Sequence, residues 1–288
     1  MEIKAYAKIN LSLEVVGRRA DGYHELVSVM QSVSLADTLV FEKKCHNGVS
    51  LDTGCDLPTD ESNLIVRAAR AYFAAVGSEF GVDIKLTKQI PMQAGLGGGS
   101  ADAAATLCAL NVLNDNALCD EELCRIGAKI GADVPFCIMG GTQICRGIGE
   151  KMTPIENALD CHVVIVKGEQ GVSTPRAFAA LDERYGDFAG FEEKTEKSIA
   201  LLEKCLKNGE INTVGGLIFN RFEQTVALDV PDVLKIKQEL LSLGAFAAQM
   251  SGSGPSVFGL FQNEQDATDA AAQMRLQGKQ AFVCRFVQ

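Results

Sequence analysis

The segment of this chain best suited to chemistry is a glycine-rich run at residues 91–101, Pro-Met-Gln-Ala-Gly-Leu-Gly-Gly-Gly-Ser-Ala. Glycines allow positive φ and close approach of a ligand, and we expect Ser100 to be the N-cap of the alanine-rich helix that follows. Amides at a helix N-terminus are unpaired and carry partial positive charge. The run therefore predicts an anion site, most simply for nucleotide phosphates. The alternative is a surface turn that only caps the helix.

The glycine run matches neither of two familiar phosphate-binding motifs. A Walker A loop ends in Gly-Lys-Ser/Thr, whereas Gly99 is followed directly by Ser100. A dinucleotide fingerprint needs a third Gly or Ala where Ser100 stands, which disfavours a nicotinamide-dependent oxidoreductase. Any lysine that contacts a transferred phosphoryl group must come from elsewhere in the chain.

Several other polar residues could contribute to such a site, although each also has a purely structural interpretation. Lys8 and Asn10 share one face of a predicted strand, which either lines a cleft or is solvated. Asp133, between a helix and an expected strand, either accepts backbone amides in a turn or acts as a base. Tyr23 and His24 follow a turn and offer a stacking ring and a hydrogen-bonding ring, or a structural histidine.

Two further segments have the same ambiguity. Residues 251–256 form a second small-residue loop between predicted strands, either a backbone nest for a ligand or a plain hairpin. Thr174 precedes Pro175 and predicts a helix start, with Phe178 one turn later. A plain N-cap and a core aromatic explain those two residues equally well.

The composition sets limits on the class of protein. The chain has 288 residues, 47% of them apolar and 22% charged, which suits two modest domains or one large one. We expect a cytoplasmic protein with no membrane partner, because no membrane-spanning run or signal peptide is evident. The ten cysteines show no C-x-x-C pair, so we expect reduced, mostly buried thiols and no metal site. The net charge of −10 disfavours nucleic-acid binding, so a polyphosphate site must be a local positive pocket, to which Lys8 and Lys88 could contribute.

Periodicity predicts an α+β chain with domains at 1–155 and 156–288. In the first part we expect strands at 3–7, 9–16, 25–33, 37–42, 82–87 and 136–146, and helices at 63–73, from the glycine run to about 113, and from 120 to about 131. In the second part we expect strands at 162–167, 245–250, 256–261 and 281–287, and helices at 195–207, 212–225, 231–243 and 264–277. The final elements suit a ferredoxin-like split βαβ arrangement.

Three segments together resemble one enzyme family. Residues 91–100 resemble the central phosphate motif of the GHMP kinases, named for galactokinase, homoserine kinase, mevalonate kinase and phosphomevalonate kinase. Residues 7–13 resemble the N-terminal motif of that family and residues 251–256 its C-terminal motif, in the expected order. The resemblance implies a two-domain fold, with an N-terminal ribosomal protein S5 domain 2-like part and a C-terminal ferredoxin-like part. It also implies a kinase that uses ATP and Mg²⁺.

Residues 17–26 and 131–136 resemble the members that phosphorylate the 2-hydroxyl of 4-diphosphocytidyl-2-C-methyl-D-erythritol, in the non-mevalonate route to isoprenoid precursors. This resemblance implies that Asp133 is the base and that Lys8 assists it. For ATP it implies the residues Pro91, Met92, Gln93, Ala94, Gly95, Leu96, Gly97, Gly98, Gly99, Ser100 and Ala101, bordered by Lys88 and Asn63. For the cytidyl diphosphate substrate it implies Asn10, Tyr23, His24, Thr174, Phe178, Gly252 and Gly254.

Within that substrate set, Tyr23 and Phe178 are expected to sandwich the cytosine, His24 to bond its edge, and Asn10 to hold the methylerythritol hydroxyls. No protein ligand of Mg²⁺ is assigned, and the protein is expected to be a monomer or a homodimer. One alternative is a related kinase for homoserine or mevalonate, although such an aliphatic alcohol needs no aromatic sandwich. Another is a non-catalytic nucleotide-binding protein, which the presence of both Lys8 and Asp133 disfavours.

Overall fold

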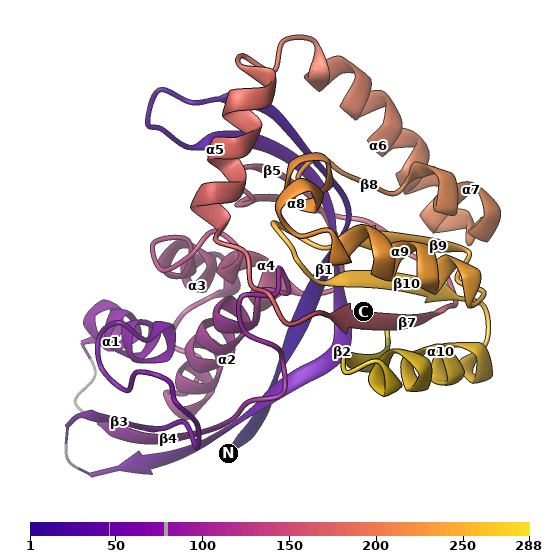
Figure 1. Cartoon of the computed structure of the whole chain (residues 1–288). Coiled ribbons are helices and arrows are strands. Elements are labelled where there is room, and N and C mark those ends of the chain that lie inside the picture. Colours follow the sequence, from indigo (N-terminus) through magenta and orange to yellow (C-terminus); the bar gives the residue numbers. More distant parts are fainter. Residues whose placement is uncertain (46, 78–79) are drawn as a thin grey trace. The chain divides into compact units, whose positions relative to one another are not determined.

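The computed structural model describes residues 1–45, 47–77 and 80–288 (Figure 1). The strands are β1 (Glu2–Arg18), β2 (His24–Lys44), β3 (Val49–Asp52), β4 (Gly81–Thr87), β5 (Thr142–Gly147), β6 (Lys151–Pro154), β7 (His162–Lys167), β8 (Phe219–Asn220), β9 (Ala247–Met250), β10 (Val257–Phe261) and β11 (Gln280–Arg285). The helices are α1 (Leu64–Val76), α2 (Gly98–Leu113), α3 (Asp120–Gly127), α4 (Val134–Met139), α5 (Thr174–Tyr185), α6 (Phe191–Asn208), α7 (Ile211–Leu217), α8 (Glu223–Asp229), α9 (Asp232–Ser242) and α10 (Glu264–Leu276). The mixed α+β content confirms the predicted fold class.

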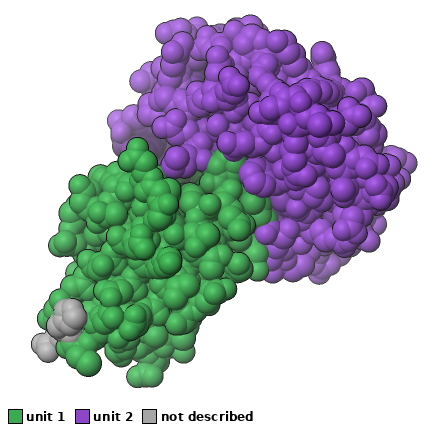
Figure 2. All heavy atoms as spheres, turned by 60° about the horizontal axis from the view of Figure 1, so that its bottom comes forward, with its two compact units in different colours: residues 1–7, 35–91, 97–140 green, residues 8–34, 92–96, 141–288 purple. Residues whose placement is uncertain are grey.

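The chain packs into two compact units, coloured separately in Figure 2. Unit 1 contains residues 1–7, 35–91 and 97–140, and unit 2 contains residues 8–34, 92–96 and 141–288. Both units contain part of β1, part of β2 and part of the glycine run. Since each unit is assembled from several segments, the linear division at residue 155 stays a prediction.

Unit 1 combines a small sheet with helices α1–α4. Strand β2 pairs with β4 in antiparallel register from Thr38↔Thr87 to Lys44↔Gly81, and β3 runs parallel to β4. Helix α2 packs against α1, α3 and α4. Its alanines are buried, because small side chains let neighbouring helices approach closely while still removing apolar surface from water.

Unit 2 contains the second half of the chain and the central parts of β1 and β2. Strand β5 pairs with β2 and β6, and β1 pairs in parallel with β8 at Ser12↔Phe219. A separate antiparallel sheet has the order β11-β7-β10-β9, and α9 and α10 pack on it (Figure 1). Val164 and Val166 of β7 join the same buried cluster as Ile236 of α9 and Met274 of α10. This arrangement confirms the ferredoxin-like half.

Three predictions of secondary structure need correction. The four short N-terminal strands are two long ones, β1 and β2. The strand predicted at 136–146 is helix α4 followed by β5, with Pro135 in the first turn of the helix, where a fixed φ is favourable. The helix predicted at 212–225 is broken into α7, β8 and α8, because the buried Asn220 turns its amide toward the carbonyls of Met250 (2.7 Å) and Gly252 (2.8 Å).

The ten cysteines are free, but fewer of them are buried than the composition predicts. All ten cysteines are free thiols; Cys145, Cys161, Cys205 and Cys284 are buried, whereas Cys45, Cys55 and Cys119 are exposed. Among the helices of the described residues, none combines the length and the apolar character needed to cross a membrane.

Candidate active site

The glycine run leads into helix α2, but its cap differs from the prediction. The N-cap is Gly97, in the left-handed region at φ 69°, and the Ala101 N–H donates to its carbonyl at 2.8 Å. Ser100 is therefore the third residue of the helix, and its prediction as the N-cap was wrong. Only glycine adopts this conformation without strain, and it has no side chain to accept the amides of the first turn. Those amides suit an anion that arrives from outside the chain.

The first part of the loop packs directly on the second small-residue loop, within unit 2. A Cβ on Gly95 would lie 2.1 Å from the Ser251 carbonyl oxygen, and a Cβ on Gly252 would lie 2.8 Å from the Gly95 oxygen. Ser251 Oγ donates to the Gly95 carbonyl at 3.0 Å, and the Ser256 N–H donates to the Ala94 carbonyl at 3.2 Å. The loop at 251–256 does join the antiparallel strands β9 and β10, and its glycines permit this backbone contact.

Lys8 and Asn10 are buried beside the same loop. The Lys8 backbone N–H donates to the Leu96 carbonyl at 3.0 Å, and the Lys8 ammonium donates to Asn10 Oδ1 at 2.8 Å. The Asn10 amide in turn donates to Ser28 Oγ at 2.8 Å. Since Lys8 is only 4% exposed and Asn10 only 1%, the alternative of a solvated strand face is wrong.

Asp133 is positioned by the start of helix α4, within unit 1. It occupies the N-cap position, but its carboxylate does not cap the helix. A Cβ built on Gly131 would lie 3.6 Å from Ser100 Oγ. The segment that carries Asp133 therefore lies against the first turn of α2.

Lys88 lies beside the first residue of α2, and its ammonium is between two buried carboxylates. Its ammonium contacts Asp37 and lies 2.7 Å from Asp102 Oδ2, and a Cβ on Gly98 would lie 3.1 Å from it. Asp37 also accepts the N–H of Ile90 at 2.8 Å, which fixes the chain just before the glycine run. The predicted nucleotide-bordering lysine is thus already paired in this structure, and its charge is balanced locally.

The pKa values of this cluster follow from burial and charge. Burial raises the pKa of Asp102 to about 7; Lys88 opposes the shift and the Asp37 carboxylate adds to it. Burial lowers the pKa of Lys88, but the charges of Asp102 and Asp37 outweigh burial and raise it. Asp102 Oδ1 is buried with no hydrogen-bond partner within the described part of the chain. Sequence reasoning missed both carboxylates, although an acid in a run of buried alanines was a usable signal.

Comparison with known proteins identifies the family. Residues 63–141 match the family model described as "GHMP kinases N terminal domain", and residues 196–280 match "GHMP kinases C terminal". A 4-diphosphocytidyl-2-C-methyl-D-erythritol kinase of Clostridium acetobutylicum is 37% identical over 292 residues, covering 100% of both chains. The chain belongs to the GHMP kinase family.

Other relatives agree with this membership. A second kinase of the same name, from Acetivibrio thermocellus, is 40% identical over 290 residues and covers 100% of this chain and 99% of its own. A crystal structure of 4-(cytidine 5'-diphospho)-2C-methyl-D-erythritol kinase has a TM-score of 0.82 at 34% identity, with 100% of both chains covered. A homoserine kinase from Cytophaga hutchinsonii has a TM-score of 0.79 at 22% identity, covering 99% of this chain and 94% of its own, and so supports the fold alone.

A second cluster of this GHMP kinase surrounds His24, within unit 2. The His24 ring stacks on Phe178 with centroids 4.5 Å apart and an interplanar angle of 16°. Its Nε2 lies 2.7 Å from Asp182 Oδ1. The neighbouring Tyr23 side chain is 60% exposed. His24 thus covers one face of Phe178, where the predicted sandwich placed only the base. Sequence reasoning missed Asp182, because it is 158 positions from its partner.

The remaining predicted residues have defined structural partners. Asn63 is the N-cap of α1: its side chain accepts from the Ile65 N–H at 2.9 Å and donates to the Pro58 carbonyl at 2.7 Å. Thr174 Oγ1 lies 2.7 Å from Ser253 Oγ, which joins the start of α5 to the loop at 251–256. Direct contact of either residue with a ligand stays a prediction.

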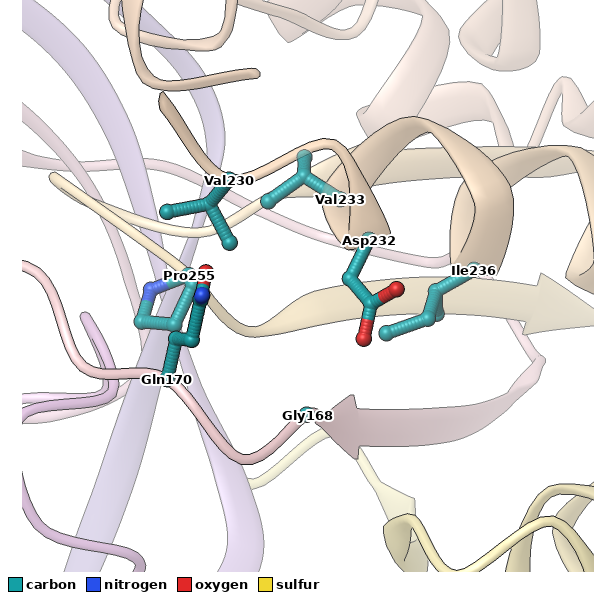
Figure 3. A pocket seen from close by; sticks show the side chains of 7 residues that line it. All are labelled: Gly168, Gln170, Val230, Asp232, Val233, Ile236 and Pro255. Carbon is teal, nitrogen blue, oxygen red and sulfur yellow. The ribbon is translucent and has the colours of Figure 1, made fainter. Parts of the chain in front are cut away.

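A small cavity of the kinase lies beyond Pro255, between α9 and the end of β7 (Figure 3). Its volume of about 10 Å³ suits a water-sized molecule, so it cannot hold a nucleotide. Asp232 on its wall is ion-paired with Lys279, whose hydrogen bond lowers the pKa of that carboxyl.

Proposed function

We propose that this kinase transfers the γ-phosphoryl group of ATP to the 2-hydroxyl of 4-diphosphocytidyl-2-C-methyl-D-erythritol. Relatives that carry the name of that kinase match essentially the whole chain at 37% and 40% identity, which supports the substrate. The observation that carries the chemistry is the shared glycine loop. Lys8 is tied to it at Leu96, and the segment of Asp133 lies against it at Ser100.

The loop supplies the phosphate site in this proposal. Phosphoryl transfer depends mainly on positioning and electrostatic stabilisation, because the phosphoryl group needs little covalent help from the protein. The amides at the start of α2 would hold the β- and γ-phosphates of ATP, and Gly97, Gly98 and Gly99 leave room for those oxygens. The substrate oxygen attacks the γ-phosphorus, the bond to the ADP oxygen breaks, and the hydroxyl proton goes to Asp133.

Lys8 and Asp133 act together in this reaction. We propose that both groups act on the same phosphate, as the resemblance of residues 7–13 and 131–136 to the motifs of the family implies. The Lys8 ammonium would balance negative charge that develops on the transferred group. Asn10 holds the ammonium through Oδ1, which gives it a positioning role besides its expected contact with substrate hydroxyls.

Mg²⁺ is expected to enter with ATP, where it would neutralise charge on the phosphate oxygens. Among the described residues, no three His, Cys, Asp or Glu side chains are grouped to hold a metal ion. We therefore assign no protein ligand to it. Mg²⁺ in kinase sites commonly keeps several waters and binds substrate phosphates. We further propose that the enzyme works in the cytoplasm, as a monomer or a homodimer.

A substrate comparison tests the proposed function. The purified protein is given ATP with the cytidyl substrate, homoserine or mevalonate in parallel, and ADP release is measured. We expect release only with the cytidyl substrate. Release with homoserine or mevalonate alone would replace this proposal with another member of the family.

The role of Asp133 is tested by the substitution Asp133→Asn. The control is the same change at an exposed aspartate, Asp160→Asn. We expect kcat to fall at least about a hundredfold in the first variant, the usual contribution of a positioned base, while ATP affinity is kept. The control should retain full activity. A D133N enzyme with near-normal kcat would remove the carboxylate from the mechanism.

A further inference from the structure

The loop that joins β9 to β10 is held at its start by one buried asparagine. Asn220 belongs to the two-residue strand β8 and is only 1% exposed. Its side-chain amide donates to the Met250 carbonyl at 2.7 Å and to the Gly252 carbonyl at 2.8 Å, and its Oδ1 accepts the Phe222 N–H at 3.0 Å. Both amide hydrogens are therefore used on the two carbonyls that flank Ser251. Two hydrogen bonds from one planar group fix the backbone on either side of that serine.

The Ser251 hydroxyl joins this loop to two other segments of unit 2. Ser251 is fully buried, and its Oγ donates to the Gly95 carbonyl at 3.0 Å and accepts the Asn10 N–H at 3.3 Å. Gly95 lies in the glycine run, two positions before the N-cap of α2, whereas Asn10 lies on β1 and its side chain holds the Lys8 ammonium. The direction of one hydroxyl thus relates the glycine run to β1, and that direction depends on the backbone that Asn220 holds.

Asn220 is itself anchored to the sheet and to β9. Strand β8 pairs with β1 at Leu13↔Asn220, and the Arg221 N–H donates to the Leu13 carbonyl at 2.9 Å. Three positions later, the Glu223 carboxylate accepts the Met250 N–H at 3.2 Å. Met250 is therefore held at both its N–H and its carbonyl by side chains from one short segment. A side chain fixed in this way can position a loop without contacting a ligand.

We propose that Asn220 is a positioning residue for ATP, which acts through Ser251 and Gly95 to hold the first part of the glycine run in the arrangement that binds phosphates. This inference rests on the proposed function, in which that run is the phosphate site. Backbone amides bind an anion well only when they already point in one direction, because ordering them on binding costs free energy. Without Asn220 the two carbonyls beside Ser251 lose their partner, and the hydroxyl is free to turn away from Gly95.

The test measures the Kd of ATP by calorimetry, without the cytidyl substrate, in wild type and Asn220→Ala. The matched control is Asn157→Ala, because Asn157 is also buried in unit 2, where its side chain donates to Gln31 Oε1 at 2.9 Å and accepts the Leu159 N–H at 3.0 Å. We expect the Kd of ATP to rise about tenfold in N220A and to stay within about twofold of wild type in N157A. An N220A protein that binds ATP as tightly as wild type overturns the proposal.

Adenosine gives a readout that separates positioning from a general structural role. Adenosine has no phosphate, so the arrangement of the glycine run should not affect its Kd, measured by competition with ATP. We expect N220A to bind adenosine as wild type does while its affinity for ATP falls. Equal losses of affinity for both ligands would show that the substitution loosens the whole site, and would overturn the positioning role.

Ser251→Ala tests the route from Asn220 to the glycine run. It removes the hydroxyl contact alone, so we expect the Kd of ATP to rise about tenfold, as in N220A. The double variant should lie within about twofold of the larger single effect, because both substitutions break the same contact. Fully additive effects would show that Asn220 does not act through Ser251, and would overturn the proposal.

Two further comparisons keep every outcome decisive. If N220A does not fold, Asn220→Asp replaces it, with the same rise in Kd expected, because an ionised carboxyl group has no donor for the two carbonyls. If neither variant folds, Asn220 serves folding and the positioning role is overturned. If wild type binds ATP and phosphorylates the cytidyl substrate, yet N220A keeps its affinity, only the role of Asn220 fails. If wild type neither binds ATP nor phosphorylates the cytidyl substrate, the proposed function fails and this inference fails with it.

Discussion

Gly95→Ala tests the backbone contact between the two glycine-containing loops. Gly95 has φ 75°. The Cβ of an alanine at this position would lie 2.1 Å from the Ser251 carbonyl oxygen, much closer than non-bonded carbon and oxygen atoms approach. The clash involves backbone on both sides, so no side chain can rotate to relieve it. The loops must separate, and with them the hydrogen bonds from Ser251 Oγ to Gly95 and from Ser256 to Ala94.

The expected magnitude has two parts. Placing alanine at positive φ costs about 1 kcal/mol, and losing each of the two hydrogen bonds costs about another 1 kcal/mol. We therefore expect the free energy of unfolding of G95A to fall by about 3 kcal/mol, measured by urea denaturation. Because the same loop is proposed to hold ATP, its KM for ATP should rise as well.

Gly278→Ala is the matched control. Gly278 has φ 79°, and no atom lies within 4 Å of its added Cβ, so it carries the backbone cost without the clash. We expect it to lose about 1 kcal/mol and to keep its KM for ATP. If G95A were no less stable than G278A and bound ATP normally, the packing of the loop on residues 251–256 would be refuted.

Two further variants probe buried charges. Because the folded-state pKa of Asp102 is raised from 3.8 to about 7, the stability it contributes is present below pH 4 and is lost as pH rises through 7. Wild type should therefore lose up to about 4 kcal/mol relative to Asp102→Asn between pH 4 and 8, and a flat difference in urea unfolding would contradict this. Arg221 holds the buried Glu14 at 2.7 and 2.6 Å, so Arg221→Met should cost about 3–5 kcal/mol by leaving that carboxylate unpaired. The double variant with Glu14→Gln should recover most of the loss, and equal unfolding energies for R221M and wild type would disprove the pairing.

Local patterns along the chain predicted the loops and most elements well. The glycine run, the hairpin at 251–256 and the alternating apolar residues of β7 depend on residues close in sequence, and all three lie where expected. The cap at Gly97 was missed because serine is the commoner N-cap and the positive φ of a glycine leaves no mark in the sequence. Helix α4 was missed because a six-residue apolar run fits a strand or a short helix equally well.

Local patterns could not predict hydrogen-bond and ion-pair partners that are distant in sequence. Asp37 and Asp102 meet at Lys88, and Asp182 meets His24, only after the chain has folded. Only the alanine-rich setting of Asp102 indicated burial, and nothing local distinguishes Asp37 or Asp182 from solvated carboxylates. The break at Asn220 has the same origin, since the carbonyls that its amide binds belong to Met250 and Gly252, 30 and 32 residues later in the chain.

The division of the chain into interleaved units has a consequence for its synthesis. Strand β1 emerges from the ribosome early, yet its parallel neighbour β8 is made about 200 residues later. The edge of β1 that pairs with β8 therefore stays unpaired until most of the polypeptide has been translated. Exposed edges of this kind invite pairing with other chains. The growing polypeptide is therefore most open to such pairing before residues 219–220 have been made.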